Sequence, residues 1–237
     1  MGKHAVILAG GQGKRLRPYT VVLPKPLMPI GDYPILEVII RQLTTQHGFT
    51  HITLAVNHQA ELIKAFFGDG SKWGITINYS LEDQPLGTMG PLKLMHELPE
   101  NFLVMNGDIL TDLNFGDFYN THVNNNCLFS ISSHQREEMI DYGVLDTSNG
   151  ILTGFREKPR NTYEVSMGIY MVSNKVLDFI PTNSPYGFDH LMLQFLQQNI
   201  PVAVKSYTGL WLDIGRPDDY IEAIEIFDQL KDKILHG

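Results

Sequence analysis

Short apolar runs alternate with helical patterns through the first half of this 237-residue chain, and this alternation limits its fold more than any other feature. Five runs have the length and the apolar composition of strands: residues 5–8, 51–56, 75–80, 102–105 and 127–132. Four stretches with helical patterns separate them: residues 34–47, 60–67, 88–98 and 115–125. Strands that alternate with helices form a largely parallel sheet. The alternation therefore predicts an α/β fold.

The pattern changes after Tyr142, where short strand-like runs follow one another. Asn149-Gly150 lies between two of these runs and favours a tight hairpin turn, so the second half is expected to be more antiparallel. Pro217 suits the first turn of a last helix, and the aspartates at positions 218 and 219 would complement its dipole. We expect one α/β domain with a mixed, mainly parallel central sheet flanked by helices.

The charge balance argues against a polyanionic partner. The chain has 18 Lys and Arg against 26 Asp and Glu, a net charge of −8, which gives no general attraction for nucleic acid or an anionic membrane. It has no run of about 18 apolar residues, and a strand is predicted almost at once, so neither a membrane span nor a signal peptide is expected. The single cysteine, Cys127, excludes an intrachain disulfide and suits a reducing cytoplasm.

A glycine-rich, basic stretch follows the first predicted strand. It contains three glycines and four positive charges: Gly10, Gly11, Gly13, Lys14, Arg15, Arg17 and Lys25. Successive backbone N–H groups without side chains can cradle anionic oxygens, and Lys and Arg match phosphate in charge and geometry. Proline on both sides of Lys25 restricts the reach of its ammonium group. The stretch predicts a site for a small polyphosphate.

Two common phosphate-binding motifs do not fit this stretch. A Walker A loop ends in Gly-Lys-Ser/Thr, but Arg15 follows Gly13-Lys14, and Leu8 stands where the first glycine belongs. A dinucleotide-binding fingerprint that began at Gly11 would need a glycine where Leu16 stands. The polyphosphate site must therefore be of another kind.

The same stretch opens a series of motifs that resembles the sugar-1-phosphate nucleotidylyltransferases, also called NDP-sugar pyrophosphorylases. The matching segments, in the family's order, are LAGGQGKRLRPYT, LPKPLMPIGDYPILE, EDQPLGTMGPL, NGD, YGV, REKP and WLDIG. The resemblance covers nearly the whole chain. It implies a Rossmann-like domain of the glycosyltransferase-A type over residues 1–237, with a nucleotide-binding half to about residue 107, a sugar-phosphate-binding half from about residue 108, and no C-terminal β-helix.

The implied reaction is attack of a sugar-1-phosphate oxygen on the α-phosphorus of a nucleoside triphosphate, with release of pyrophosphate. A phosphate monoester has its second pKa near ~6, so the nucleophile is already an anion and needs no activating triad. Catalysis would then rest on in-line positioning and neutralisation of charge. The resemblance assigns the catalytic roles to Arg15 and Lys25.

The resemblance also assigns binding residues. Those expected around the nucleotide are Leu8, Ala9, Gly10, Gly11, Gly13, Glu82, Gly87 and Thr88. Those expected around the sugar phosphate are Asn106, Gly143, Glu157, Lys158 and Gly168. Asp108 and Asp213 each follow or end a predicted strand, and two hard carboxylates there would hold Mg²⁺ together with substrate phosphates and water.

Glu82 stands at the position that reads the base in the family that the chain resembles. A carboxylate only accepts hydrogen bonds, which suits the two adjacent donors of guanine, whereas the mixed edge of uracil or thymine suits glutamine. GTP is therefore favoured as the donor. Mannose 1-phosphate is favoured as the acceptor, because EDQPLGTMGPL and NGDILTDLNF resemble the mannose-1-phosphate guanylyltransferase branch of the family. Met167 departs from the family pattern in the expected sugar pocket, where many relatives have alanine.

Several alternatives stay open from the sequence. The chain could be a D-glycero-D-manno-heptose-1-phosphate guanylyltransferase, or a uridylyl-, thymidylyl- or cytidylyltransferase of the same family. It could also be a noncatalytic regulatory subunit of the pyrophosphorylase type, or a glycosyltransferase of the related nucleotide-binding fold. Whether it forms a homo-oligomer is open as well.

Overall fold

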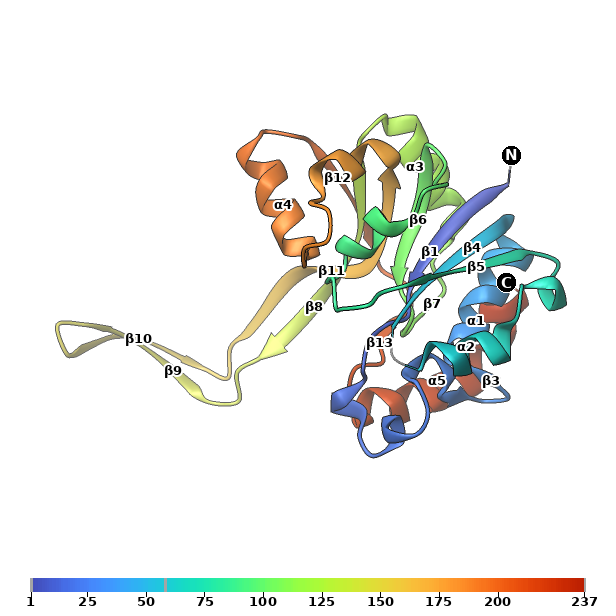
Figure 1. Cartoon of the computed structure of the whole chain (residues 1–237). Helices are drawn as coiled ribbons and strands as arrows, with labels where there is room; N and C mark the ends of the chain where they lie inside the picture. The colour runs from blue at the N-terminus through green and yellow to red at the C-terminus, as the bar shows by residue number, and fades with distance from the viewer. Residues whose placement is uncertain (1, 58, 237) are drawn as a thin grey trace.

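A seven-stranded sheet runs through the centre of the protein (Figure 1). The structure is a computed structural model, and it describes residues 2–57 and 59–236, except for the side chains of residues 46, 233 and 236. In spatial order its strands are β12 (Val202–Tyr207), β8 (Phe129–Met139), β11 (Arg160–Ser173), β6 (Asn101–Asn106), β1 (Lys3–Leu8), β4 (Phe49–Val56) and β5 (Thr76–Leu81). Adjacent strands are parallel, except that β11 is antiparallel to both of its neighbours. The predicted mixed, mainly parallel sheet is confirmed.

Helices and short turns cover both faces of this sheet. The helices are α1 (Ile35–Arg41), which continues as a π-helical turn to Gln46, α2 (Ala60–Phe67), α3 (Phe115–Asn125), α4 (Phe188–Gln197) and α5 (Pro217–His236). Side chains of a strand alternate between faces, so in β1 Ala5 and Ile7 pack into a core with α1, α2, α3 and α5, and Val6 packs into a second core with α4. None of the described helices is long and apolar enough to cross a bilayer.

The predicted helices agree with the structure in four places and fail in one. The helices expected at residues 34–47, 60–67, 115–125 and from Pro217 onward are present, the first with a π-helical end. Residues 88–98 form only a 3₁₀ turn at Gly90–Leu94, so a helix there is wrong. Pro91 lacks an N–H and Gly90 disfavours the helix, while burial of Met89 and Leu92 holds the segment on the core.

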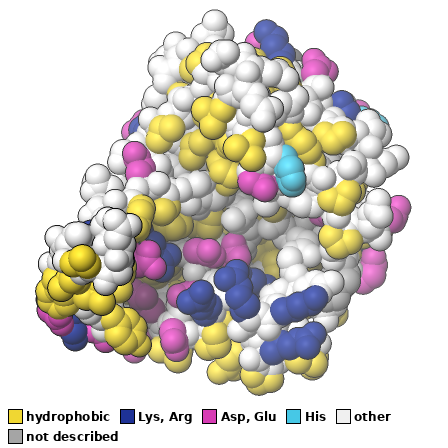
Figure 2. Space-filling view, turned by 90° about the vertical axis from the view of Figure 1, so that its left-hand side faces the viewer, with side chains coloured by type: hydrophobic (Ala, Val, Ile, Leu, Met, Phe, Trp, Pro, Cys, Tyr) yellow, Lys and Arg dark blue, Asp and Glu magenta, His cyan; other side chains and the backbone are white. Residues whose placement is uncertain are grey.

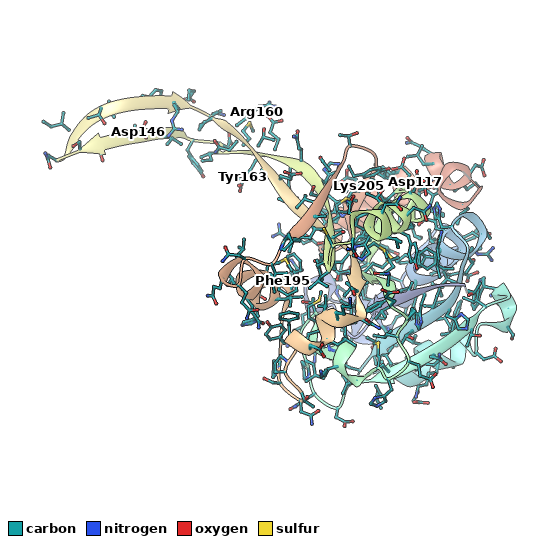
Figure 3. The ribbon with its side chains drawn as sticks, turned by 90° about the horizontal axis from the view of Figure 1, so that it is seen from above. Asp117, Asp146, Arg160, Tyr163, Phe195 and Lys205 are labelled. Atoms are coloured by element: carbon teal, nitrogen blue, oxygen red, sulfur yellow. The ribbon has the colours of Figure 1, made fainter. Side chains whose placement is uncertain are left out.

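A two-stranded arm projects from the body. Beyond the sheet, β8 and β11 stay paired with each other and lead into β9 (Gly143–Ser148) and β10 (Ile151–Glu157), and we call residues 136–163 the arm. Figures 1 and 3 show it extending away from the rest of the molecule. At its tip Asn149 and Gly150 both have positive φ, 52° and 77°, which confirms the predicted hairpin turn.

The order in which the chain adds strands to the sheet changes direction at β1. From β1 it adds β4 and β5 on one side, and then returns to place β6 on the other side. Ligands of open α/β sheets bind outside the carboxyl ends of the strands at such a reversal. The fold therefore directs attention to the loops that follow β1 and β6.

Candidate functional site

The ends of β1 and β6 lie side by side, which brings two distant loops together. Leu8 is in register with Asn106, and the N–H of Gly107 donates to the Leu8 carbonyl at 3.0 Å. A Cβ at Gly107 would lie only 3.1 Å from that oxygen, so a glycine suits this close approach. The glycine-rich loop and Asp108 therefore meet at the carboxyl edge of the sheet.

Asp213 reaches the same place on a short ribbon. Strands β7 (Ile109–Thr111) and β13 (Trp211–Asp213) are antiparallel, with Asp213 opposite Ile109, and the N–H of Ile214 donates to the Asp108 carbonyl at 3.0 Å. The pKa of the Asp213 carboxyl is raised, first by its partial removal from water and then by the negative charge of Asp108. Two carboxylates thus share one corner of the molecule.

Lys25 is held against Asp108. Its ammonium group forms an ion pair with Asp108 Oδ2, and only 11% of the lysine side chain is exposed. The backbone around it is a 3₁₀ turn in which the N–H of Leu27 donates to the Pro24 carbonyl at 2.8 Å. The proline-flanked turn therefore fixes the cation beside the carboxylate.

The carboxylate pair meets a basic requirement of a magnesium site. Asp108 Oδ1 is buried and has no hydrogen-bond partner, whereas buried polar atoms are normally satisfied. Among the described residues no group of three or more His, Cys, Asp or Glu side chains could hold a metal. Two carboxylates with substrate phosphates and water suit Mg²⁺, which keeps part of its hydration shell. Asp108 and Asp213 therefore fit that ion. The two carboxylates alone do not fill its coordination shell, and the phosphates of a bound substrate would supply further oxygen ligands.

The glycine-rich loop forms the wall of a cavity of about 520 Å³, which we call the loop cavity. Gly13 adopts a left-handed conformation with φ 57°, and its carbonyl accepts a 2.7 Å hydrogen bond from Thr20 Oγ1. Gly11 has no atom within 4 Å of where a Cβ would be, so its backbone faces open space. The cavity is lined by Gly10, Gly11, Gln12, Gly13, Lys14, Arg15, Lys25, Asn57, Pro85, Asp108 and Gly215.

A second cavity, of about 360 Å³, lies between the root of the arm and the start of α5, and we call it the arm-side cavity. Its lining residues are Arg15, His134, Gln135, Arg136, Glu137, Trp211, Leu212, Asp213, Gly215, Arg216, Asp219 and Glu222. Arg15 and Gly215 line both cavities, and a Cβ at Gly215 would lie 3.5 Å from Arg15 Nη2. Figure 2, which faces the arm-bearing side, shows this hollowed region with Lys and Arg beside Asp and Glu side chains.

Three guanidinium groups of the arm-side cavity are available to an anion. Within the described part of the chain, Arg15, Arg136 and Arg216 have no carboxylate at ion-pair distance. The cavity also contains carboxylates, of which Glu137 is paired with Arg160 at 3.4 Å. Guanidinium and carboxylate groups in one hollow suit a ligand that carries both an anionic group and hydroxyls.

Three residues expected at the sugar phosphate lie on the arm and line neither cavity. Gly143 is opposite Glu157 in the ribbon, and a Cβ at Gly143 would lie 3.2 Å from Glu157 Oε2. Lys158 has φ 42° and pairs with Asp141 at 2.7 Å, with half of its side chain exposed. The structure therefore does not bring these residues to the carboxylate pair.

Asn106 and Gly168 lie together beneath the loops, and neither lines the two cavities. Gly168 has φ 72°, and a Cβ there would lie 2.6 Å from Asn106 Nδ2. The neighbouring Met167 is 1% exposed, and its carbonyl accepts a 3.1 Å hydrogen bond from Trp211 Nε1. Its placement in an open sugar pocket is therefore wrong, because its side chain packs in the core.

The segment from Glu82 to Thr88 is tied to its own loop and to α4. Glu82 Oε2 accepts from the N–H of Leu86 at 3.1 Å, and burial raises the pKa of this carboxyl. Gly87 has φ 78°, and Thr88 Oγ1 accepts a 2.8 Å hydrogen bond from the first N–H of α4, that of Phe188. None of the three lines the loop cavity, although Glu82 lies beside Gly10.

Leu8 and Ala9, also expected at the nucleotide, line a small hollow of about 30 Å³ together with Gly11, Lys25 and Asp108. Arg136 and Arg216, which lie in the second half of the chain, are not among the site residues predicted from the sequence. Arg216 could have been found, because it directly follows the WLDIG motif that carries Asp213. No local signal marks Arg136, because only the path of β8 brings it to the cavity.

In a comparison with known proteins, a family model described as Nucleotidyl transferase matches residues 4–229. A UTP–glucose-1-phosphate uridylyltransferase of Synechocystis sp. is 34% identical over 93% of this chain and 62% of its own. A mannose-1-phosphate guanyltransferase beta-A of Xenopus laevis is 34% identical over 95% of this chain and 64% of its own. The chain thus spans a little under two thirds of the length of these relatives.

Two solved structures share the fold. HddC from Yersinia pseudotuberculosis, complexed with GMP-PN, has a TM-score of 0.73 and 27% identity and covers 96% of this chain and 100% of its own. A putative glucose-1-phosphate thymidylyltransferase from Bacillus anthracis has a TM-score of 0.77 over 94% of both chains. Because the Bacillus anthracis protein is only 23% identical, its similarity is evidence for the fold and not for the function.

Proposed function

Because the chain belongs to the nucleotidyl transferase family, we propose that it transfers a nucleotidyl group from a nucleoside triphosphate to a sugar 1-phosphate and releases pyrophosphate. One observation carries this proposal. The loop cavity and the arm-side cavity adjoin at Arg15, beside two carboxylates and a fixed lysine. Two substrates that must react with each other need two such compartments with the charges at their junction.

The donor triphosphate would occupy the loop cavity. Backbone N–H groups of the glycine-rich loop would bind its oxygens, and Lys14 and Arg15 would neutralise its charge. Lys25 would stand at the α-phosphate, because it lines the loop cavity and is held against Asp108. These groups are positioned before the substrate arrives, which is the condition for electrostatic stabilisation of a transition state.

The acceptor would enter from the arm-side cavity. Its phosphate would lie between Arg15 and the guanidinium groups of Arg136 and Arg216, and its hydroxyls would meet the carboxylates of that cavity. An oxygen of this phosphate forms a bond to the α-phosphorus while the bond from that phosphorus to the β-phosphate oxygen breaks. Because the attacking oxygen is already anionic, no general base is required. The roles of Glu157 and Lys158 stay predictions from the resemblance.

Mg²⁺ is part of the proposal. Asp108 and Asp213 would hold it, and when bound it would neutralise the negative charge of the substrate phosphates. Lys25 orients Asp108 through the ion pair, while Oδ1 of the same carboxylate stays without a partner. A cytoplasmic location, expected from the single cysteine, likewise stays a prediction.

We favour GTP and mannose 1-phosphate as the substrates. Glu82 lies beside Gly10, and its carboxylate suits the donors of guanine better than the mixed edge of uracil. The relatives include both a guanyltransferase and a uridylyltransferase at 34% identity, so a uridylyltransferase is the second candidate.

A substrate panel tests both levels of the proposal. Four nucleoside triphosphates are each combined with mannose, glucose and heptose 1-phosphates, and pyrophosphate release is measured with Mg²⁺. Release with any pair supports nucleotidyl transfer, and the preferred pair identifies the base and the sugar. Glu82→Gln should shift the preference from GTP toward UTP. Absence of release in every combination would contradict the function and favour a noncatalytic subunit.

A further inference from the structure

The arm carries apolar side chains that the rest of its own chain leaves in solvent. Eight of the nineteen large hydrophobic residues found exposed in the described part of the chain are on it: Met139, Ile140, Tyr142, Leu145, Ile151, Leu152, Phe155 and Tyr163. Their exposed fractions run from 38% to 78%. Concentrated apolar exposure of this kind on a soluble domain marks an interaction surface.

The outer part of the arm has no structural support of its own. Strands β9 and β10 pair with each other and with no third described strand. An isolated two-stranded ribbon is marginally stable in water, and it needs a third strand or a packed face. The exposed apolar side chains of the arm are the surface through which such packing can occur.

The charges of the arm are largely satisfied within the arm itself. Asp146 pairs with Arg156 at 3.1 Å, and Asp141 pairs with Lys158 at 2.7 Å. A third pair joins Glu137 and Arg160 across β8 and β11. Because these opposite charges neutralise one another along the ribbon, electrostatic attraction to a charged partner would be weak. An apolar surface fits it better.

The same chain offers an apolar surface of this kind, which we call the α4 groove. It is a hollow of about 570 Å³ between α4, β12 and the inner parts of β8 and β11, lined among others by Val165, Phe188, Met192, Leu196, Ile200 and Val204. Leu196 is 73% exposed and Val204 56%. This groove has no charged residue among its lining side chains except Glu164, which accepts a hydrogen bond from Ser133 Oγ at 2.7 Å.

The arm cannot fill the groove of its own chain. The groove lies at the root of the arm, around Val165, whereas the apolar side chains extend outward to the turn at Asn149-Gly150. A strand rises about 3.3 Å per residue, so the turn is several tens of Å from the root. Figures 1 and 3 show the ribbon leading away from α4. The groove needs the arm of another molecule.

We infer that two copies of this chain exchange arms, so that the apolar side chains of each arm lie in the α4 groove of the other copy. Both surfaces belong to one chain, so a twofold axis satisfies both at once. An arm of this composition offers on the order of several hundred Å² of apolar area, and two such contacts reach the size class of stable dimers, about 800 Å² per partner.

Charge substitutions on each surface test the exchange. Leu152→Asp with Phe155→Asp alters the arm, and Leu196→Asp alters the groove; Ser148→Asp and Gln197→Asp are the matched controls, on exposed polar residues next to each surface. Oligomeric state is measured by sedimentation over a range of concentrations, and circular dichroism checks that each variant is folded. The wild-type chain and both controls should be dimers, and the arm and groove variants should dissociate at least about tenfold more readily.

Mixing the two altered proteins separates arm exchange from any other dimer. In a mixed dimer the unaltered arm of the groove variant meets the unaltered groove of the arm variant, so one of the two contacts is intact. The mixture should therefore form dimers at concentrations where each variant alone is monomeric. A monomeric wild-type chain, a variant that stays dimeric or a mixture without dimers would each overturn the inference. No substrate is needed, so the outcome is independent of the proposed function.

Discussion

At the scale of single residues, Lys25 and Arg15 should determine the rate of the proposed reaction. Lys25 lines the loop cavity and is held against Asp108, and Arg15 lines both cavities, so both cations lie where negative charge would develop. Loss of one preorganised charge of this kind costs on the order of 10²–10³ in rate. Lys25→Ala and Arg15→Ala should therefore lower kcat for pyrophosphate release by that factor. Lys64→Ala, which removes an exposed ion pair with Glu61, is the control, and near-normal turnover in Lys25→Ala would refute its assignment.

Arg136 and Arg216 should act on the acceptor rather than on the donor. Both line the arm-side cavity but not the loop cavity. A charge-assisted contact to phosphate is worth about 1.5–3 kcal/mol, roughly 10- to 100-fold in binding. Replacing either arginine with alanine should raise KM for the sugar phosphate by that factor and leave KM for the triphosphate nearly unchanged. Arg156→Ala, farther out on the arm, is the comparison, and an equal effect on both substrates would contradict two separate compartments.

Asp213 should make the metal-free protein less stable as the pH rises. Its pKa is raised above the ordinary value of 3.8, so the folded state holds the proton more tightly than the unfolded state does. Ionisation therefore costs stability as the pH passes from below 3.8 through the raised pKa. In a chelator, Asp213→Asn should melt higher than the wild type at neutral pH, and the difference should shrink as the pH falls toward 3.8. A difference independent of pH would show that the carboxyl charge is not its cause.

At the scale of elements, Thr88 connects a loop to the first turn of α4. Its hydroxyl accepts from the N–H of Phe188, one of the donors that a helix leaves unpaired at its start. Thr88→Val should lower the free energy of unfolding by about 1 kcal/mol in urea titrations, whereas Thr88→Ser should retain it. If Thr88→Val raised KM for the triphosphate without changing stability, the residue would act on the nucleotide as the resemblance implies.

The same scale shows why some elements could be predicted and others could not. The helix at residues 60–67 and the turn at Asn149-Gly150 follow from local pattern, and both are present. The stretch from Thr88 to Leu98 has helix-forming residues, but Pro91 and burial of Met89 override them. No local sequence pattern predicts the direction of the arm, because alternation of apolar and polar residues identifies a strand but not the direction in which it leaves the sheet.

At the scale of the whole molecule, the site is assembled from segments that meet only in the fold. Motifs pointed to Lys25, Asp108 and Asp213, and the topology of β1, β6 and β13 places them at one edge. Glu157 belongs to an equally specific motif, yet it lies on the arm, outside both cavities. The motifs therefore identified candidate functional residues, whereas the path of the backbone determines which of these residues line the same cavity. The division into two functional halves stays a prediction.

If substrate and Mg²⁺ connect these segments, binding should stabilise the molecule as a unit. A ligand at 100 times its Kd adds about 2.7 kcal/mol to the folded state. In a chain of this length that corresponds to a rise in Tm of roughly 5–10 °C. A nonhydrolysable triphosphate with Mg²⁺ should produce this shift in the wild type and little of it in Asp108→Asn, while Glu61→Gln, an exposed carboxylate, should behave as the wild type.

The metal dependence of that shift identifies its origin. Asp108 carries the buried oxygen without a partner and also pairs with Lys25, so its loss would remove the proposed metal ligand and the contact that orients the lysine together. The wild-type shift should therefore fall sharply in a chelator, which removes the ion but leaves the lysine contact intact. Calorimetry with Mg²⁺ and the triphosphate analogue separates the two contributions. An equal shift with and without Mg²⁺ would mean that the carboxylate pair orients Lys25 and holds no metal.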